Sequence, residues 1–383
     1  MDLKITETQQ MIMDGAANFL RKAAPPTKIT RWFKENTTFV PDLYKNAAEL
    51  GWLGMMIPEA YGGSDVSLTD CAVLYEALGR GPLPGPLFSS AILAALVIRL
   101  GGSEAQKQEL LPAIAKGKAI IVLAMNDQGA FWGPDAVETQ MKRDHGSVIL
   151  NGTKRFVLDA EGATHFICCA RDEAGQIALV LVNREMSGVS VNLCGGFIAS
   201  TSEVIFDHVK VPAENIIGEP NAGWALLDKA LQKALPILCA YKVGACQEIF
   251  DFTNEYTRQR VVFGQPIGRF QRVQDHCVDI STHLDSARWI TYETLWRIET
   301  DQPSSASVHE AKAVASEAYY EACNLSHKVH AGPGTDYDHP LMAHSALAHT
   351  LYQYLGTPIF HKRKMVDALY PRAHQAAPVR SAE

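Results

Sequence analysis

Residues 258–274 read RQRVVFGQPIGRFQRVQ, and they separate two long segments that both have the periodicity of α-helices. The stretch combines several arginines with two glycines, a proline and two phenylalanines. Guanidinium groups and free backbone N–H groups both donate hydrogen bonds to anions, so cations and small residues in such a loop are suited to binding one. The stretch therefore predicts two helices joined by a loop that holds an anion.

The helical periodicity on both sides of this loop continues over most of the last 160 or so residues. Apolar residues recur every three or four positions in the spans 227–252, 273–295, 311–329 and 344–355, with a continuation at 361–369. Four long helices joined by short loops predict an antiparallel bundle.

The first 118 residues also have a helical pattern, whereas short segments rich in β-branched residues follow. These segments are 119–125, 148–150, 165–170, 177–182, 189–193, 203–206 and 209–211. They predict an antiparallel β-domain. We therefore expect a mainly α protein with a central β-domain: an N-terminal helical domain (1–118), a β-domain (119–221) and a C-terminal helix bundle (222–383).

Composition excludes several classes of function. A net charge of −7 over 383 residues argues against general nucleic-acid binding. The eight cysteines include no C-x-x-C pair, which indicates reduced thiols and a cytoplasmic protein. No apolar run is long enough to span a membrane. The histidines between 327 and 361 lack the spacing of a metal site, and His330 is expected to be a packed core residue.

The order of elements and several motifs resemble the acyl-CoA dehydrogenase family over essentially the whole chain. The most specific match is R-x-x-F-G-x-x-I-x-x-F-Q, carried by Arg260, Phe263, Gly264, Ile267, Phe270 and Gln271. Similar phrases occur at 57–63, 111–117, 151–154 and 207–215, and KVHAGPG at 328–334 stands where the family has Q-x-H-G-G-x-G.

The resemblance implies that FAD binds between the β-domain and the bundle, across a subunit contact. Arg260 would meet the FAD pyrophosphate of the neighbouring subunit, with Phe263 and Gln271 nearby. The turn that contains Lys328 and Gly332 would approach the adenosine end. The chemistry implied is removal of the α-proton of an acyl-CoA by a carboxylate, with transfer of the β-hydride to the flavin.

The flavin edge departs from the family pattern. Asn126 begins the segment that corresponds to T-E-P-x-A-G-S-D and can still form a hydrogen bond to a flavin. The bulky Phe131 and Trp132 follow it, either as a lid over the acyl site or as a plug in it. The family's W-I-T step is Phe156-Val157-Leu158, so Leu158 replaces a threonine hydroxyl.

The catalytic base is the larger departure. The family's glutamate directly precedes a Gly-Thr pair, and here Leu355 precedes Gly356 and Thr357. The family's alternative glutamate position falls near Ala234. Neither residue can take a proton. Substitute bases are Asp336, Asp338 and Glu248, although solvated surface charge is the plainer interpretation of all three.

The sequence therefore leaves three hypotheses open. The segment EALGRGPLPGP at 76–86 and the LGTP at 355–358 resemble the bacterial family members that degrade sterol or bile-acid side chains as α2β2 heterotetramers. On the first hypothesis, this chain completes an FAD site while a partner subunit supplies the base, and an electron-transferring flavoprotein accepts the electrons. On the second hypothesis, the chain is a scaffold subunit without flavin. On the third, it is a homotetrameric dehydrogenase with a relocated base.

Overall fold

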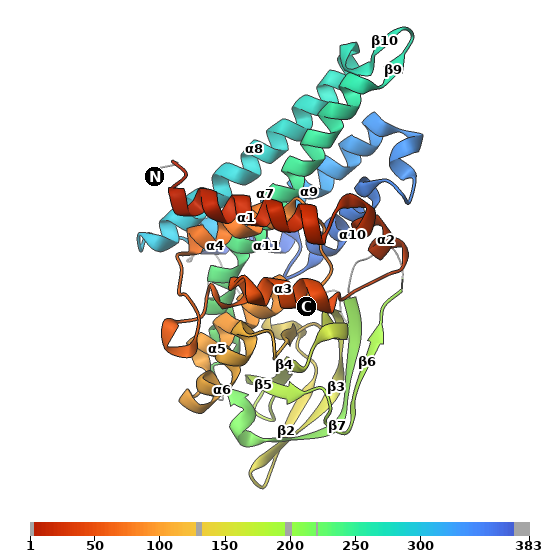
Figure 1. The fold of residues 1–383 in the computed structure, drawn as a ribbon. Coiled ribbons are helices and arrows are strands. Elements are labelled where there is room, and N and C mark those ends of the chain that lie inside the picture. Colours follow the sequence, from red (N-terminus) through yellow and green to blue (C-terminus); the bar gives the residue numbers. More distant parts are fainter. Residues whose placement is uncertain (1–3, 128–131, 196–200, 220, 371–383) are drawn as a thin grey trace, which may run out of the picture.

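The computed structural model describes residues 4–127, 132–195, 201–219 and 221–370. Its elements follow one another in three groups along the chain: helices, then a sheet, then helices (Figure 1). The helices of the first group give way to the sheet between Ala115 and Ile121, and the sheet gives way to the last group of helices between Ile217 and Gly223. The predicted fold class, mainly α with a central β-domain, is confirmed.

In the first group, several helices have N-terminal residues that favour the start of a helix. The helices are α1 Glu7–Ala23, α2 Pro26–Lys34, α3 Pro41–Glu49, α4 Leu68–Gly79, α5 Ala95–Gly101 and α6 Glu104–Ala115. At α1, Thr6 and Gln9 form a capping box in which each side chain accepts a hydrogen bond from the other's backbone N–H, both at 3.1 Å. A π-helical turn, Ser89–Ala94, leads into α5.

The central sheet has the strand order β6-β7-β3-β2-β4-β5-β8, with β1 paired to β4. The strands are β1 Ile121–Ala124, β2 Gln140–Asp144, β3 Ser147–Leu158, β4 His165–Arg171, β5 Ile177–Asn183, β6 Val189–Leu193, β7 Thr201–Pro212 and β8 Ile216–Ile217. Most pairs are antiparallel, as predicted, but β1 and β2 both run parallel to β4. The β2–β3 hairpin lies between β1 and β4 along the chain and returns the chain to the end where β1 began, so β4 runs in the same direction.

The last group of helices forms the predicted bundle with one difference. Its helices are α7 Gly223–Gln259, α8 Gln271–Glu299, α9 Ser305–His330, α10 Pro340–Gln353 and α11 Pro358–Leu369. The predicted fourth long helix is two shorter ones. The chain leaves the right-handed helix region at Leu355 (φ 59°) and Gly356 (φ 112°), and Pro358 then starts α11.

Helix α7 crosses α4 at very short range, and two glycines allow it. A Cβ on Gly244 would lie 1.7 Å from the carbonyl oxygen of Glu76, and one on Gly79 would lie 1.9 Å from that of Tyr241. Any larger residue would separate the two helices. This contact fixes the face of α7 that carries Leu238 and Tyr241, which both line the cavity described below.

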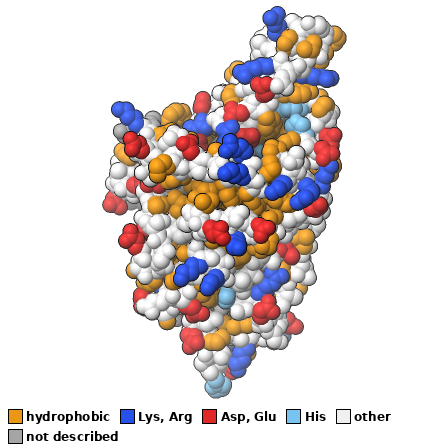
Figure 2. Space-filling model, in the orientation of Figure 1, with side chains coloured by type: hydrophobic (Ala, Val, Ile, Leu, Met, Phe, Trp, Pro, Cys, Tyr) orange, Lys and Arg blue, Asp and Glu red, His pale blue; other side chains and the backbone are white. Residues whose placement is uncertain are grey.

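The stretch between α7 and α8 forms a small hairpin, so the predicted helix–loop–helix unit is confirmed. Strands β9 Val261–Val262 and β10 Gln265–Pro266 pair, and the 3-10 turn Ile267–Arg269 leads into α8. Phe263 (φ 51°) and Gly264 (φ 76°) have the left-handed conformations that a tight hairpin turn requires. The hairpin projects beyond the rest of the molecule, and Figure 2 shows Lys and Arg side chains near this end.

Within the described residues, no helix combines the length and the apolar character that crossing a bilayer requires.

Candidate active site

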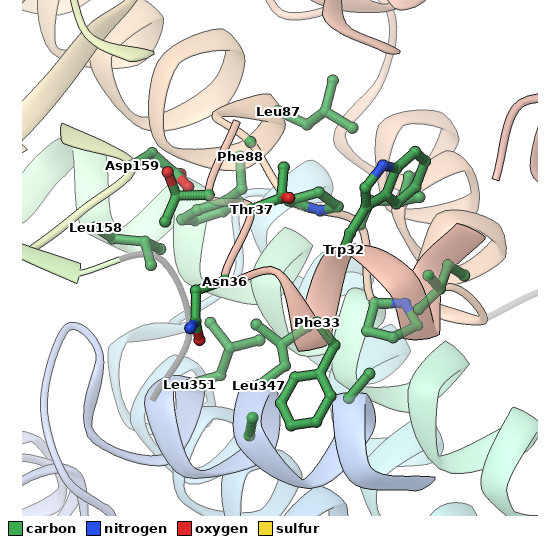
Figure 3. Close-up of a pocket in the computed structure, with 18 of the residues that line it drawn as sticks. Trp32, Phe33, Asn36, Thr37, Leu87, Phe88, Leu158, Asp159, Leu347 and Leu351 are labelled. Carbon is green, nitrogen blue, oxygen red and sulfur yellow. The ribbon is translucent and has the colours of Figure 1, made fainter. Parts of the chain in front are cut away.

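A cavity of about 290 Å³ lies where the N-terminal helices, the bundle and one end of the sheet meet (Figure 3). Its walls come from α2, the 82–88 segment, α4, α7, α10 and the ends of β3 and β6. Most lining side chains are apolar, among them Trp32, Phe88, Leu238, Leu347 and Leu351. The cavity is thus suited to a bulky apolar group.

Two tyrosine hydroxyls in the cavity wall already donate to backbone carbonyls. Tyr75 Oη donates to Leu87 O (2.7 Å), and Tyr241 Oη donates to Gly81 O (3.1 Å). Both bonds hold the 81–88 segment against α4 and α7. These hydroxyls therefore shape the wall and have no proton left to donate to a ligand.

Asp159 is a cavity residue that no motif of the sequence indicates. It follows β3 in a left-handed conformation (φ 61°), which Asp adopts more readily than most residues. Its side chain is 6% exposed, and its Oδ2 accepts a hydrogen bond from Ser89 Oγ at 2.5 Å. Burial raises the pKa of this carboxyl to about 7.

The predicted flavin-edge residues lie at the end of the sheet that borders the cavity. Leu158 is buried and lines the cavity, whereas Phe156 is 54% exposed and has a φ of 54°. Asn126 lies beside this strand, because its carbonyl accepts a hydrogen bond from Arg155 N (2.8 Å). Trp132 is half-buried. Phe131 lies outside the described residues, so the prediction of a lid or a plug stays open.

A buried ion pair anchors the segment that carries Asn126. Lys154 on β3 is fully buried and donates to Asp127 Oδ2 (2.7 Å) and to Met125 O (2.9 Å). The Asp127 carboxylate also accepts hydrogen bonds from Glu138 N (2.8 Å) and from the Thr139 hydroxyl. The residues on both sides of Asn126 are therefore fixed to β3.

Two hydroxyls beside the flavin edge have no hydrogen-bond partner among the described residues. They are Thr201 Oγ1 and Ser202 Oγ, both buried. In the antiparallel register of β3 and β7, Thr201 stands opposite Leu158 and Ser202 stands opposite Val157. Opposed residues share a face, so the Thr201 hydroxyl lies on the face of Leu158. Ser202, the next residue of the strand, points to the opposite face with Val157. Buried hydroxyls without partners are unfavourable, and a polar ligand on the face of Leu158 would satisfy that of Thr201.

The other predicted cofactor residues lie at the far end of the bundle. Arg260 and Gln271 flank the hairpin, and both are exposed. Phe263 at its tip is 91% exposed and contacts the Phe270 ring. No hydrogen bond or ion pair of the Arg260 side chain occurs within the described part of the chain, whereas Arg258 pairs with Glu255 (3.7 Å). Figure 1 shows this hairpin and β3 far apart, so one chain does not bring the two groups together.

Lys328 and Gly332 lie at the same end of the bundle as the hairpin. Lys328 is exposed, and its charge acts on His276 in the first turns of α8. A Cβ on Gly332 would meet nothing within 4 Å, and this glycine has no positive φ. The chain itself therefore does not need glycine at 332. Only a ligand or a second chain against this turn would require it.

Ala331 has a strained backbone in that turn. Its φ of 54° and ψ of −133° belong to a region that glycine enters freely and alanine does not. We expect Ala331→Gly to stabilise the protein by about 1 kcal/mol, because the relief of strain exceeds the entropy of the added glycine. Urea unfolding would measure the change. Gly332→Ala is the control and should leave stability unchanged or slightly raised; a loss of stability in Ala331→Gly would contradict the expectation.

The residues at the family's base positions are buried and apolar. Ala234 is fully buried on α7, and Leu355 is 4% exposed. The backbone around Leu355 is held by buried donors: His361 Nε2 to Leu355 O (2.9 Å), Lys312 Nζ to Gly356 O (2.9 Å) and Lys242 Nζ to Leu351 O (3.0 Å). Burial lowers the pKa of Lys242 to about 8 and that of Lys312 well below its usual value. No carboxylate of the described residues pairs with either lysine.

The three substitute bases lie away from the cavity. Asp338 pairs with Lys34, and Asp336 accepts a hydrogen bond from Asp338 N (2.9 Å); both are exposed. Glu248 pairs with Arg80 at 2.9 Å. None of the three lines the cavity. Their plainer interpretation as surface charge agrees with these positions.

The histidines of the bundle have structural contacts. His330 is buried, its Nδ1 lies 2.9 Å from Ser326 O, and its ring stacks on Tyr256 at 4.3 Å. Its predicted role as a packed core residue agrees with this environment. Within the described ranges, no group of three or more His, Cys, Asp or Glu residues is arranged to hold a metal ion.

Comparison with known proteins identifies the family. The chain matches the N-terminal domain of acyl-CoA dehydrogenases at residues 6–118, the middle domain at 123–209 and the C-terminal domain at 221–369. It is 30% identical to the mitochondrial long-chain specific acyl-CoA dehydrogenase of Rattus norvegicus over 78% of this chain and 72% of that protein. It is 28% identical to the probable acyl-CoA dehydrogenase YngJ of Bacillus subtilis, over 87% and 90% of the two chains.

A solved structure has the same fold. PigA with FAD and proline superposes with a TM-score of 0.90 and 24% identity, over 97% of this chain and 100% of that one. With the three domain matches and the long-chain relative, the chain belongs to the acyl-CoA dehydrogenase family.

Proposed function

We propose that the chain is an FAD-binding subunit of an acyl-CoA dehydrogenase that desaturates a bulky acyl-CoA between its α- and β-carbons, together with a second, different subunit. The observation that carries the proposal is the contrast between two parts of the site. The cavity and the residues that would hold a flavin are present, whereas Leu355 and Ala234 occupy the two positions from which the family abstracts the proton.

The described residues fit FAD in several respects. The Thr201 hydroxyl is buried on the face of Leu158 and has no hydrogen-bond partner among the described residues. The Arg260 guanidinium has no partner within the described ranges, and guanidinium forks suit diphosphate oxygens. The separation of the hairpin from β3 supports a site completed across a subunit contact (Figure 1). When bound, FAD supplies the acceptor for the hydride that leaves the β-carbon.

The residues of this chain would bind, orient and shield the reactants. Asn126 would form a hydrogen bond at the flavin edge, where Phe156 and Leu158 would exclude water once FAD covers them. Arg260, with Phe263, Gln271, Lys328 and Gly332, would hold the diphosphate and adenosine parts of the cofactor of a neighbouring subunit. The apolar cavity would hold the acyl group, and a steroid side-chain acyl-CoA is our candidate because Trp32, Leu238 and Leu351 form broad apolar walls.

The rest of the proposal follows from the family resemblance. The partner subunit would supply the carboxylate base, and an electron-transferring flavoprotein would accept the electrons. We place the enzyme in the cytoplasm, because all eight cysteines are unpaired. A homomeric dehydrogenase with its own base is the second candidate, and the cavity carboxylate of Asp159 is the observation that favours it.

The test is to purify the chain alone and, where a related chain is encoded beside it, together with that chain. We expect flavin absorbance in the complex, and turnover with acyl-CoA only there, because the chain has no glutamate at either base position. Flavin and turnover from the chain alone would show that no partner is required. Absence of flavin from both preparations would favour the scaffold hypothesis over an enzyme.

A further inference from the structure

Asp159 lies at one end of the cavity, beside Leu158 and across from Trp32 and Phe33 (Figure 3). The left-handed turn after β3 directs the chain there, and Ser89 of the π-helical turn donates to Oδ2. Among the described residues, Ser89 is the one hydrogen-bond donor to this carboxylate, and no lysine or arginine forms an ion pair with it. A carboxylate has about four acceptor positions, so most of its capacity is unused.

Four tyrosines lie within the electrostatic range of this carboxylate and do not neutralise it. They are Tyr44 on α3, Tyr75 on α4, Tyr241 on α7 and Tyr354 after α10, and the charge of Asp159 acts on each of them. Burial raises the pKa of every one, to about 12 for Tyr44, so all remain uncharged near neutral pH. The hydroxyl protons of Tyr44, Tyr75 and Tyr241 are donated to other atoms.

The backbone alone does not explain an aspartate here. Asparagine is equally suited to a left-handed turn, and its side-chain oxygen would accept the Ser89 hydrogen bond. Burying a carboxylate without a cation is unfavourable, and this burial raises the pKa of the Asp159 carboxyl to about 7. A ligand group that donates to the carboxylate would offset this unfavourable burial.

We propose that Asp159 is a specificity residue that accepts a hydrogen bond from a hydroxyl group on the ring system of the substrate's acyl group. The substrate class would then be a CoA thioester of a bulky, mainly apolar acid with one hydroxyl on its ring system. The apolar walls bind the skeleton, and the single carboxylate at the end of the cavity selects the hydroxyl. This inference rests on the proposed function, because it requires the cavity to hold an acyl group.

The test measures equilibrium binding by calorimetry to the protein in the flavin-containing assembly in which it purifies. The probes are α,β-unsaturated CoA thioesters of one fused-ring acid, as the unsubstituted compound, a set of monohydroxylated isomers and the corresponding ketones. They cannot be desaturated again at that bond, so binding is read without turnover. We expect one hydroxylated isomer to bind about 10- to 100-fold more tightly than the unsubstituted compound.

Two variants and one control test whether the Asp159 side chain causes this preference for the hydroxyl. Asp159→Gly keeps the left-handed turn without a side chain and should abolish the preference for the hydroxyl. Asp159→Asn keeps the shape without charge and should reduce the preference to a few-fold. Thr37→Val removes another polar lining group and should change nothing. In the wild type, the preference for hydroxyl over ketone should increase from pH 6 to pH 8, because the ionised carboxylate accepts but cannot donate.

Each other outcome has a definite meaning. Equal binding of all isomers, or a preference that survives in Asp159→Gly, would overturn the specificity role while the proposed function stands. The Asp159 variants could instead lose turnover with hydroxylated and unsubstituted saturated substrates alike, at unchanged affinity. That result would also overturn the specificity role and would identify Asp159 as the base that removes the α-proton. If no acyl-CoA binds to the wild type, the proposed function fails and the inference fails with it.

Discussion

Lys154→Met is expected to destabilise the protein by about 3–5 kcal/mol, because it leaves the carboxylate of Asp127 buried without a cation. Lys154 is fully buried and Asp127 is 3% exposed. The lysine Nζ joins the Asp127 carboxylate at 2.7 Å to the Met125 carbonyl at 2.9 Å. Methionine has a similar volume but no donor. Both acceptors would therefore lose a hydrogen bond that water cannot replace inside the domain.

The measurement is the free energy of unfolding from urea titration, with a matched control on the same sheet. Lys210 pairs with Asp144 at 2.9 Å, a similar distance, but the lysine side chain is 62% exposed. Lys210→Met should therefore change stability by less than about 1 kcal/mol. The double variant Lys154→Met with Asp127→Leu should recover much of the loss, because it removes both buried charges. Equal effects of Lys154→Met and Lys210→Met would contradict the expectation.

A local consequence follows for the flavin edge. Met125, Asn126 and Asp127 are consecutive, and Lys154 fixes the residues on both sides of Asn126. A variant that folds without this lysine should therefore hold Asn126 less firmly. Weaker flavin retention in folded Lys154→Met than in Lys210→Met would support the role proposed for Asn126.

The fold could be predicted well from the sequence, because its signals are local and repeated. The helical stripes of α7, α8 and α9 each extend over several turns, and every segment predicted as a strand on β-branched composition overlaps a strand. The segments 203–206 and 209–211, predicted as two strands, are parts of the single strand β7. The predictions failed where a signal was short or polar. Strand β2, QMKRD, has mostly exposed residues and no β-branched one, so its composition gave no indication of a strand.

The candidate site could be predicted only in part. Motif residues such as Arg260 and Leu158 are recognisable because their spacing along the chain is characteristic. Asp159 and Ser89 are 70 positions apart, and their contact depends on where a π-helical turn meets the end of β3. The position of the Thr201 hydroxyl on the face of Leu158 depends likewise on the register of β3 and β7. Such juxtapositions leave no pattern in a single sequence.

Arg260→Ala is expected to weaken FAD binding at least about tenfold, because a guanidinium–diphosphate contact contributes roughly 1.5–3 kcal/mol. The residue ends α7, and the Arg260 backbone joins the hairpin through a hydrogen bond from Ile267 N (2.9 Å) that alanine would keep. Since its side chain has no partner within the described residues, the substitution should leave the hairpin itself intact. The readout is the ratio of flavin to protein in the purified assembly, followed by titration of the apoprotein with FAD.

Arg258→Ala is the matched control for this experiment. It removes the same group two residues earlier, where the guanidinium pairs weakly with Glu255 at 3.7 Å. If the hairpin offers only diffuse positive charge, the two variants will lose flavin equally, and the specific role of Arg260 will be wrong. If Arg260 contacts the diphosphate of a neighbouring subunit, its variant alone will lose flavin while unfolding at the same urea concentration as the wild-type apoprotein. Mixing Arg260→Ala chains with Asn126→Ala chains should then restore flavin in part, because a site between subunits can combine the wild-type hairpin of one chain with the wild-type flavin edge of the other, whereas a site within one chain always carries one of the two defects.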